Sequence, residues 1–356
     1  MLDGDKDFET GLNAVLSALD LLAGQLKGQA ERSEGLMRCW QRALTLAEGV
    51  ERWRSGVDEA RVKWAELFSH SLHLNSTPLS IAEIFGSRIE GHARAWIFTS
   101  ATLSVNNDFG HYCGQMGLAE ARTASWSSPY DFAEQALLCI PDRLPDPNTP
   151  EHTEAVVEAA LPVIEAAGGG AFLLFTSLRA MRNGYQLLRQ AFEARGLDYP
   201  LLTQGEGSRS EMLVRFRDLG NAVLVGSHSF WEGVDVRGEA LSLVVIDKLP
   251  FAPPDDPVLA ARIDRMNREG RSAFFEYQLP EAVIMLKQGA GRLIRDETDR
   301  GVLMICDPRI VSRSYGKRVL ASLPPMKITR NVKEAVAFFN RRPTTRPGTR
   351  PAAIRK

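Results

Sequence analysis

Between residues 151 and 323, short apolar runs alternate with longer segments of helical periodicity, and this alternation constrains the fold of the 356-residue chain most strongly. Strands separated by crossover helices form a parallel sheet that helices cover on both faces. We therefore expect an α/β fold here. The predicted helices are 151–167, 178–195, 209–218 and 280–293, and the predicted strands are 171–175, a strand near Leu201, 222–225, 241–246 and 302–306.

The first 60 residues carry apolar side chains at helical spacing, interrupted by a polar break around Ser33. They should be mostly helical. Two short strands are expected next, over 62–68 and around Leu72 and Leu74, and a buried strand over 93–103. A loop-like stretch from Ser125 to Pro150 contains five prolines, and we place a domain junction between Gly117 and Tyr130.

Composition limits the classes of partner and compartment. Lys and Arg number 43 against 44 Asp and Glu, so a polyanionic partner must be met by a local basic patch. No apolar run approaches the roughly 20 residues that span a bilayer, and the acidic start lacks a signal-peptide n-region, which favours a cytoplasmic location. The isolated cysteines and scattered histidines have no metal-ligand spacing, so no metal site is expected. The cysteines are Cys39, Cys113, Cys139 and Cys306.

Four segments carry residues suited to chemistry, and we expect all four at turns that leave the carboxyl ends of strands. The first contains Thr99, Ser100, Ala101 and Thr102, which by themselves are typical of a strand terminator. In the second, Thr176 and Ser177 precede a predicted helix that also carries Arg179 and Arg182. This arrangement suits an anion site or a simple N-cap.

The third segment, Ser227 to Gly238, has two glycines around Val234 to Val236, with Phe230 and Trp231 before them. It suits either a functional turn or a plain hairpin over a core. In the fourth, Gly289 and Gly291 interrupt a predicted helix, and Arg292 and Arg295 would share one helix face suited to phosphate oxygens. A ladder of salt bridges with Asp296, Glu297 and Asp299 is the structural alternative.

The order of TSAT, LLFTS, FWEGVDVRG and QGAGRLIR resembles the later motifs of superfamily 2 helicases. The sequences SPYDF (128–132), LPDP (144–147) and CDPRI (306–310) are similar to those of the XPD/DinG group, and the resemblance extends from about residue 62 to residue 325. It implies an ATP-dependent 5′–3′ DNA helicase that acts on single strands in DNA repair or replication. Two RecA-like lobes would close on ATP.

The resemblance also implies roles for individual residues. Arg295 would be the arginine finger and Arg292 a second γ-phosphate ligand. Gln288 would help to hold ATP, and Glu232, Gly233 and Asp235 would bind ATP and link it to the DNA track. Residues 99–102 would couple hydrolysis to lobe movement. Single-stranded DNA would contact the following five residues: Thr176, Ser177, Arg179, Ser229 and Phe230. A replication or repair protein is a further expected partner.

Three family features are absent from the sequence: the G-x-x-x-x-G-K-[ST] phosphate loop, the DEAH-type box and the four cysteines of the iron–sulfur domain. We therefore expect the carboxyl-terminal part of such a helicase, with ATP and Mg²⁺ shared with a first lobe and no ATPase activity of its own. The expected parts are a helical arch remnant (1–60), the end of the first RecA-like lobe (61–121), the second RecA-like lobe (122–335) and a basic disordered tail (336–356).

An alternative of another class is an ATP-independent single-strand DNA-binding or adaptor module. A complete enzyme of a different α/β family is disfavoured, because the sequence shows no nucleophile–base pair and no cluster of metal ligands.

Overall fold

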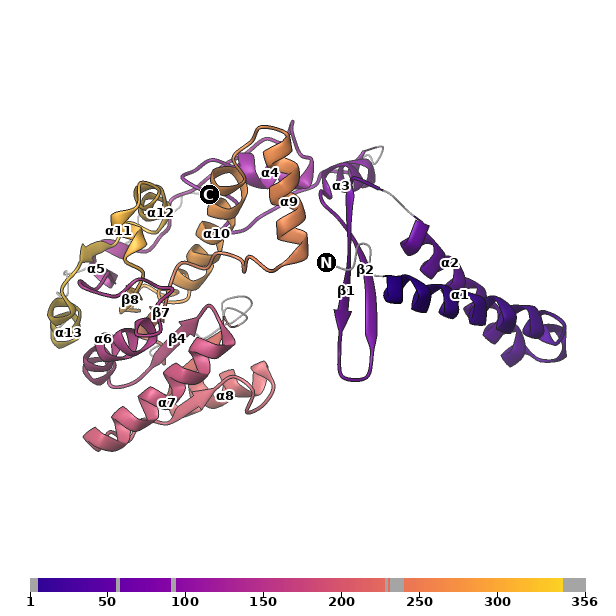
Figure 1. Cartoon of the computed structure of the whole chain (residues 1–356). Coiled ribbons are helices and arrows are strands. Elements are labelled where there is room, and N and C mark those ends of the chain that lie inside the picture. Colours follow the sequence, from indigo (N-terminus) through magenta and orange to yellow (C-terminus); the bar gives the residue numbers. More distant parts are fainter. Residues whose placement is uncertain (1–5, 56–57, 91–93, 228–229, 231–239, 342–356) are drawn as a thin grey trace, which may run out of the picture. The chain divides into compact units, whose positions relative to one another are not determined.

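The computed structural model describes residues 6–55, 58–90, 94–227, 230 and 240–341. The chain forms two compact units (Figure 1). Unit 1 comprises Met1–Gly91, Gln115–Gly117 and Pro253–Ala273, and unit 2 comprises His92–Gly114, Leu118–Ala252 and Phe274–Lys356. The predicted domain divisions at residues 60, 121 and 335 stay predictions. The two compact units are each assembled from several segments of the chain, so they do not test where one predicted domain ends and the next begins.

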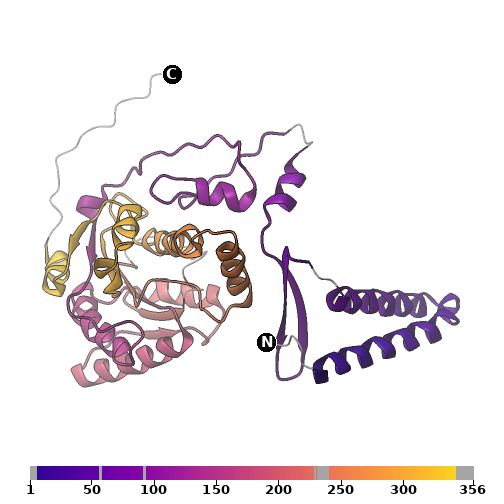
Figure 2. The ribbon, with the colours of Figure 1, turned by 45° about the horizontal axis from the view of Figure 1, so that its top comes forward.

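Unit 1 begins with two long helices that lie side by side in both views (Figures 1 and 2), α1 (Lys6–Lys27) and α2 (Glu34–Ser55). The short helix η1 (Ala30–Arg32) joins them. Their buried residues are Leu12, Leu16 and Ala23 on α1 and Ala43 and Ala47 on α2. Small alanines on one helix let the leucines of the other approach closely, and the predicted helical character with a break near Ser33 is confirmed.

The rest of unit 1 is built around a β-hairpin. Strand β1 (Arg61–Leu67) pairs antiparallel with β2 (Leu72–Pro78), from Arg61 opposite Pro78 to Leu67 opposite Leu72. Both predicted strands are therefore confirmed. Two further helices, α3 (Ala82–Ile89) and α9 (Pro257–Arg268), belong to this unit. The Nε of Arg262 in α9 donates to the Leu79 carbonyl at 3.0 Å.

Unit 2 contains a seven-stranded sheet in which all strand pairs are parallel. The spatial order is β5-β6-β4-β7-β8-β3-β9. The strands are β3 (Ala136–Cys139), β4 (Ala171–Phe175), β5 (Leu201–Thr203), β6 (Val223–Ser227), β7 (Leu243–Ile246), β8 (Gly301–Ile305) and β9 (Lys327–Thr329). The predicted parallel α/β sheet is confirmed, whereas β3 and β9 were not predicted.

Helices cover both faces of this sheet, because successive side chains of each buried strand point to opposite faces. On β4, Leu173 and Phe175 pack in the core with α6 (His152–Ala167), α7 (Leu178–Arg195) and α13 (Val332–Asn340). Phe172 and Leu174 pack on the other side with α8 (Arg209–Leu219), α10 (Leu279–Ala290) and α12 (Gly316–Ser322). The shorter helices are α4 (Gly110–Met116), α5 (Phe132–Gln135), the π-helix η3 (Phe274–Gln278) and α11 (Arg309–Ser312).

Three sequence-based expectations are wrong. Residues 94–103 form no strand: Ile97 is 81% exposed, and no described strand lies beside this run to take its hydrogen bonds. Helix α10 ends at Ala290 rather than at residue 293. The next N–H groups bond in tighter turns, in which the Leu293 N–H donates to the Ala290 carbonyl three residues before it. Residues 336–340 of the predicted tail are helical, because α13 continues to Asn340, while residues 342–356 lie outside the described part.

No helix in the part of the chain that the structure describes is long and apolar enough to cross a membrane.

The contact between α7 and β4 depends on a glycine. A Cβ added to Gly184 would lie 2.4 Å from Cζ of Phe175, whose ring is buried and has no room to move. We expect Gly184→Ala to lower the free energy of unfolding by about 1–3 kcal/mol through overpacking. Urea unfolding followed by circular dichroism measures this change.

The matched control is Gly24→Ala in α1, where an added Cβ would meet nothing within 4 Å. That substitution should stabilise its helix by up to about 1 kcal/mol, because alanine is the better helix former. Equal unfolding midpoints for Gly184→Ala and the wild type would contradict the proposed close packing.

Candidate functional site

The turn from β4 to α7 forms a helix start at the carboxyl edge of the sheet. Ser177 caps α7: its Oγ accepts from the Ala180 N–H at 3.2 Å. The N-cap interpretation is thus confirmed. Ser177 and Arg179 are exposed, Thr176 is half-buried, and the partial positive charge of a helix start favours anions here. The predicted DNA contact of these residues stays a prediction.

Asp247, directly after the neighbouring strand β7, holds this turn in place. Its carboxylate accepts from the Thr176 N–H at 3.0 Å and the Thr176 hydroxyl at 3.3 Å, and from its neighbour Lys248 N–H at 2.7 Å. Asp247 is 2% exposed, and its burial raises the pKa to about 7, although the charge and N–H of Lys248 and the two Thr176 bonds act in the opposite direction. Sequence analysis missed this residue; its signal is an acidic side chain immediately after an apolar strand.

The end of β6 lies beside the end of β4, because the paired strands place Ser227 opposite Phe175. Ser227 donates its N–H and hydroxyl to Oε1 of Gln204, each at 2.8 Å. Phe230 is 3% exposed and packs in the core, and this burial leaves its ring no exposed face for the predicted contact with DNA. Four predicted residues of this segment, Ser229, Glu232, Gly233 and Asp235, lie outside the described residues.

A pocket of about 400 Å³ lies next to the start of α7. Arg182 and Tyr185 of α7 line it on one side, and Thr203 and Gln204 after β5 line it on the other. Together with Arg179, this pocket extends the basic surface of the helix start along the carboxyl edge of the sheet.

Arg292 and Arg295 lie at the opposite edge. Their loop runs from the end of α10 into the amino end of β8. Gln135, which immediately precedes β3, donates to the carbonyls of Asp296 and Asp299 at 2.9 Å, and this contact fixes the loop at the amino edge. The expectation that all four segments follow strand carboxyl ends is therefore wrong for this one, and also for residues 99–102, because no described strand leads into them. Because α10 has ended, the argument that the two arginines share a helix face is also wrong.

The arginine loop is tied down by several hydrogen bonds. The Arg295 and Asp296 N–H groups donate to Oδ2 of Asp299 at 2.7 and 2.8 Å, and the Tyr130 hydroxyl donates to the Arg295 carbonyl at 2.5 Å. Arg295 is half-buried, and burial lowers the pKa of its guanidinium, while the charges of Asp299 and Tyr130 raise it. Gln288 lies in the last turn of α10, just before this loop. The loop therefore presents arginines from a fixed backbone, an arrangement suited to binding phosphate oxygens.

The segment from Thr99 to Thr102 is an irregular turn that is anchored nearby. Its Ser100 Oγ lies 3.1 Å from Thr102 Oγ1 and accepts from the Thr102 N–H at 3.2 Å. Two residues further, the Ser104 carbonyl accepts from Nζ of Lys287 at 2.8 Å. Lys287 precedes Gln288, so the structure brings the predicted coupling segment to the end of α10 that leads to the arginines.

Among the described residues, no three His, Cys, Asp or Glu side chains come together in a way that could hold a metal ion. The described cysteines therefore do not gather into a ligand set for an iron–sulfur cluster. The arginine loop fits the phosphates of a nucleotide.

Comparison with known proteins places this arrangement in a class. Residues 160–326 match the family model of a helicase C-terminal domain. Over 321 residues the chain is 45% identical to the ATP-dependent DNA helicase YoaA of Escherichia coli, covering 90% of this chain and 50% of YoaA. Over 273 residues it is 36% identical to the ATP-dependent helicase DinG of Mycobacterium tuberculosis, covering 75% of this chain and 40% of DinG.

A solved XPD helicase structure matches the fold with a TM-score of 0.53 at 17% identity, covering 86% of this chain and 56% of that one. The sheet of unit 2 therefore has the fold of a RecA-like helicase lobe, and residues 160–326 within it are similar to a helicase C-terminal domain. The predicted resemblance of the chain to the XPD/DinG group of helicases is confirmed. The chain spans about half the length of the curated relatives it matches.

The buried Asp247 predicts a pH dependence of stability. Its folded pKa of about 7 lies above the unfolded value of about 3.9, so the folded state binds the proton more tightly. Its contribution to stability is present below about pH 4 and is lost as the pH rises to about 7. In Asp247→Asn the amide oxygen can still accept both N–H groups, and the amide nitrogen can donate to the Thr176 hydroxyl, so this loss should disappear.

Urea unfolding midpoints at several pH values between 4 and 8 test this difference. The control is Asp198→Asn, which changes an exposed carboxylate of the same unit and should leave the pH profile as in the wild type. Parallel profiles for the wild type and Asp247→Asn would show that Asp247 does not titrate in this range.

Proposed function

We propose that this chain supplies the second motor lobe of an ATP-dependent 5′–3′ DNA helicase that acts on single-stranded DNA in repair or replication. The relatives YoaA and DinG are named ATP-dependent helicases, and the match to the helicase C-terminal domain covers both predicted contact regions of the lobe. ATP and Mg²⁺ would bind between this lobe and a first lobe, and single-stranded DNA would be the other substrate.

One observation carries the proposal: the lobe presents two different anion-binding arrangements at opposite edges of one sheet. The carboxyl edge has a helix start with Thr176, Ser177 and exposed Arg179, which suits the repeating phosphates of a DNA backbone. The amino edge has Arg292 and Arg295 on a fixed loop, which suits the concentrated charge of a nucleotide. Two separate anion-binding arrangements allow the lobe to contact a nucleotide and DNA at the same time.

In this proposal each element of the chain has a limited task. ATP supplies the phosphoryl-transfer chemistry when bound. Arg295 and Arg292 neutralise the negative charge on its phosphates, with Arg295 as the arginine finger, and Gln288 helps to hold the nucleotide. Thr176, Ser177 and Arg179 hold the DNA backbone, and residues 99–102 couple hydrolysis to movement of the lobes. Glu232, Gly233 and Asp235 keep their predicted roles in nucleotide binding, and Ser229 in DNA binding.

The DNA contact can be separated from the capping role of Ser177. Ser177→Asp keeps a good N-cap but places a negative charge where the DNA phosphates are proposed to bind. We expect unchanged stability and at least about tenfold weaker binding of a fluorescent oligothymidylate at low salt, measured by anisotropy.

The control is Asn331→Asp, which caps α13 at the same edge of the sheet. Its strand β9 lies four strands from β4, roughly 19 Å at the usual spacing of paired strands. This variant should bind DNA like the wild type. If both variants bind equally well, the start of α7 is not a DNA contact.

The nucleotide contact is tested by ATP hydrolysis. The chain alone should show no DNA-stimulated hydrolysis, because its sequence has no phosphate-binding lysine loop. In a chimera in which this chain replaces the matching part of E. coli YoaA, hydrolysis should be present, and Arg295→Ala should reduce its rate by about 10³- to 10⁵-fold.

Arg300→Ala is the control in the chimera: it removes an arginine from the end of the same loop, whose guanidinium packs over the Phe338 ring. Hydrolysis there should stay within a few-fold of the parent. Hydrolysis by the chain alone that vanishes in Arg295→Ala would overturn the shared-site proposal. DNA binding by a chimera without any hydrolysis would favour the adaptor alternative.

A further inference from the structure

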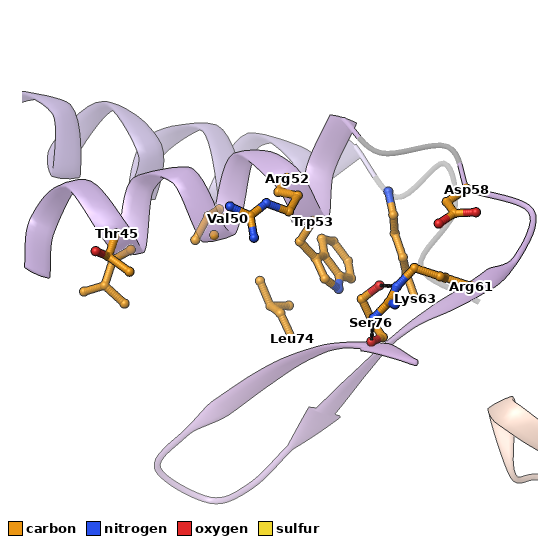
Figure 3. A pocket seen from close by; sticks show the side chains of 11 residues that line it. Thr45, Val50, Arg52, Trp53, Asp58, Arg61, Lys63, Leu74 and Ser76 are labelled. Atoms are coloured by element: carbon orange, nitrogen blue, oxygen red, sulfur yellow. Dashed lines mark hydrogen bonds between the residues drawn. The ribbon is translucent and has the colours of Figure 1, made fainter. Parts of the chain in front are cut away.

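Unit 1 contains a pocket of about 730 Å³ between α2 and the β1–β2 hairpin (Figure 3). Its volume is in the range of small-molecule sites. The lining residues come from the second half of α2 and from both strands of the hairpin, and they combine apolar, aromatic and basic side chains: Thr45, Leu46, Gly49, Val50, Arg52, Trp53, Asp58, Arg61, Lys63, Leu74 and Ser76.

The aromatic wall of this pocket is held in a fixed orientation. The indole Nε1 of Trp53 donates to the Asn75 carbonyl of β2 at 2.9 Å, and the ring of Phe8 meets the Trp53 ring edge-on at a centroid distance of 6.1 Å. Figure 3 shows the ring between Leu74 on one side and Arg61 and Lys63 on the other. A fixed, half-buried indole next to Leu46, Val50 and Leu74 suits a flat, apolar ring system.

Three cations line the same pocket against one carboxylate. Arg61 is half-buried, and its guanidinium is fixed by bonds to Oγ and the carbonyl of Ser76 at 2.9 and 2.5 Å, which leave further N–H donors (Figure 3). Nζ of Lys63 lies 5.7 Å from the centroid of Trp53. Within the described ranges, neither of these cations nor Arg52 forms an ion pair with a carboxylate. The pocket therefore keeps positive charge for an anionic ligand.

A flat ring beside a negative group is typical of a nucleotide. The charged side chains of the pocket favour a nucleotide within a DNA strand over a free triphosphate. The positive charge of the pocket comes from separate side chains, Arg52 on α2 and Arg61 and Lys63 on β1. Separate cations on α2 and β1 suit phosphodiesters with one charge each better than the concentrated charge of a triphosphate.

We propose that this pocket binds a nucleotide unit of single-stranded DNA, with the base against Trp53 and the flanking phosphates at Arg52, Arg61 and Lys63. It is a DNA contact outside the helicase C-terminal domain. The inference rests on the proposed function only in taking single-stranded DNA as a ligand of the chain. It needs neither the arginine loop nor the start of α7.

Photo-crosslinking of the full chain to a short oligothymidylate containing 5-bromodeoxyuridine tests the pocket. Tryptic cleavage after Arg52 and Arg54 separates Trp53 from Trp64, so mass spectrometry identifies the labelled residue. We expect crosslinks at Trp53, with the half-saturating DNA concentration raised about tenfold by Arg52→Glu or by Lys63→Gln. Neither substituted side chain donates to another side chain in the described residues, so folding should be retained.

Arg42→Glu is the matched control, since it makes the same charge change on an exposed position of α2 about 15 Å along the helix and does not line the pocket. It should label like the wild type. Ser177→Asp should also retain crosslinking at Trp53, which separates failure of this pocket from failure of the proposed DNA contact on the motor lobe.

Absence of a crosslink at Trp53, or equal loss in Arg42→Glu and Arg52→Glu, would overturn the proposal. A competition arm distinguishes the source of the nucleotide. If free thymidine monophosphate or ADP displaces the oligomer at equal nucleotide concentration, the pocket is a site for free nucleotides and the single-strand proposal is wrong.

Discussion

Burial of both faces of the parallel sheet in unit 2 is the constraint on which the rest of this lobe depends. Every residue of β4, β6, β7 and β8 is buried, so polar side chains can meet a ligand only where strands end. The chemistry is therefore divided between two edges. Thr176 and Asp247 follow strands, and the arginine loop precedes one. This division follows from covering a parallel sheet with helices on both sides, whatever the ligand.

Carboxylates that bind backbone N–H groups fix the loops at both edges. Asp299 holds Arg295 and Asp296 at the amino edge, and Asp247 holds Thr176 at the carboxyl edge. Asp307, fully buried, accepts from the Leu249 N–H and from the Arg309 guanidinium, both at 2.7 Å. Burial lowers the pKa of Arg309, but the bond and charge of Asp307 outweigh it and raise that pKa. Fixed loops reduce the entropy that must be lost when a ligand binds.

Sequence periodicity was sufficient for elements whose burial pattern is local. Helices α6 and α7 and strand β4 between them follow from their own residues, with Ser177 as a cap. Strands β3 and β9, only a few residues long, form because β8 and β3 offer hydrogen bonds to them, and an isolated run cannot show this. The motif order predicts a role for Arg295, but the expectation that its segment follows a strand carboxyl end is wrong. The hydrogen bond between Asp247 and Thr176 joins positions 71 residues apart, which no local pattern shows.

The placement of the two edges restricts how the proposed motor can work. A nucleotide at the arginine loop and DNA at the start of α7 would be separated by a close-packed sheet, which transmits motion as a rigid body rather than by bending. Coupling would then depend on contacts at the rim of the lobe. Lys287 of α10 bonds to Ser104, and Glu281 of α10 lies 2.7 Å from Nε2 of His111. Helix α10 therefore contacts the segment after Thr102 and also leads directly into the arginine loop. A movement of the nucleotide loop would thus reach that segment through one helix, without any change inside the core.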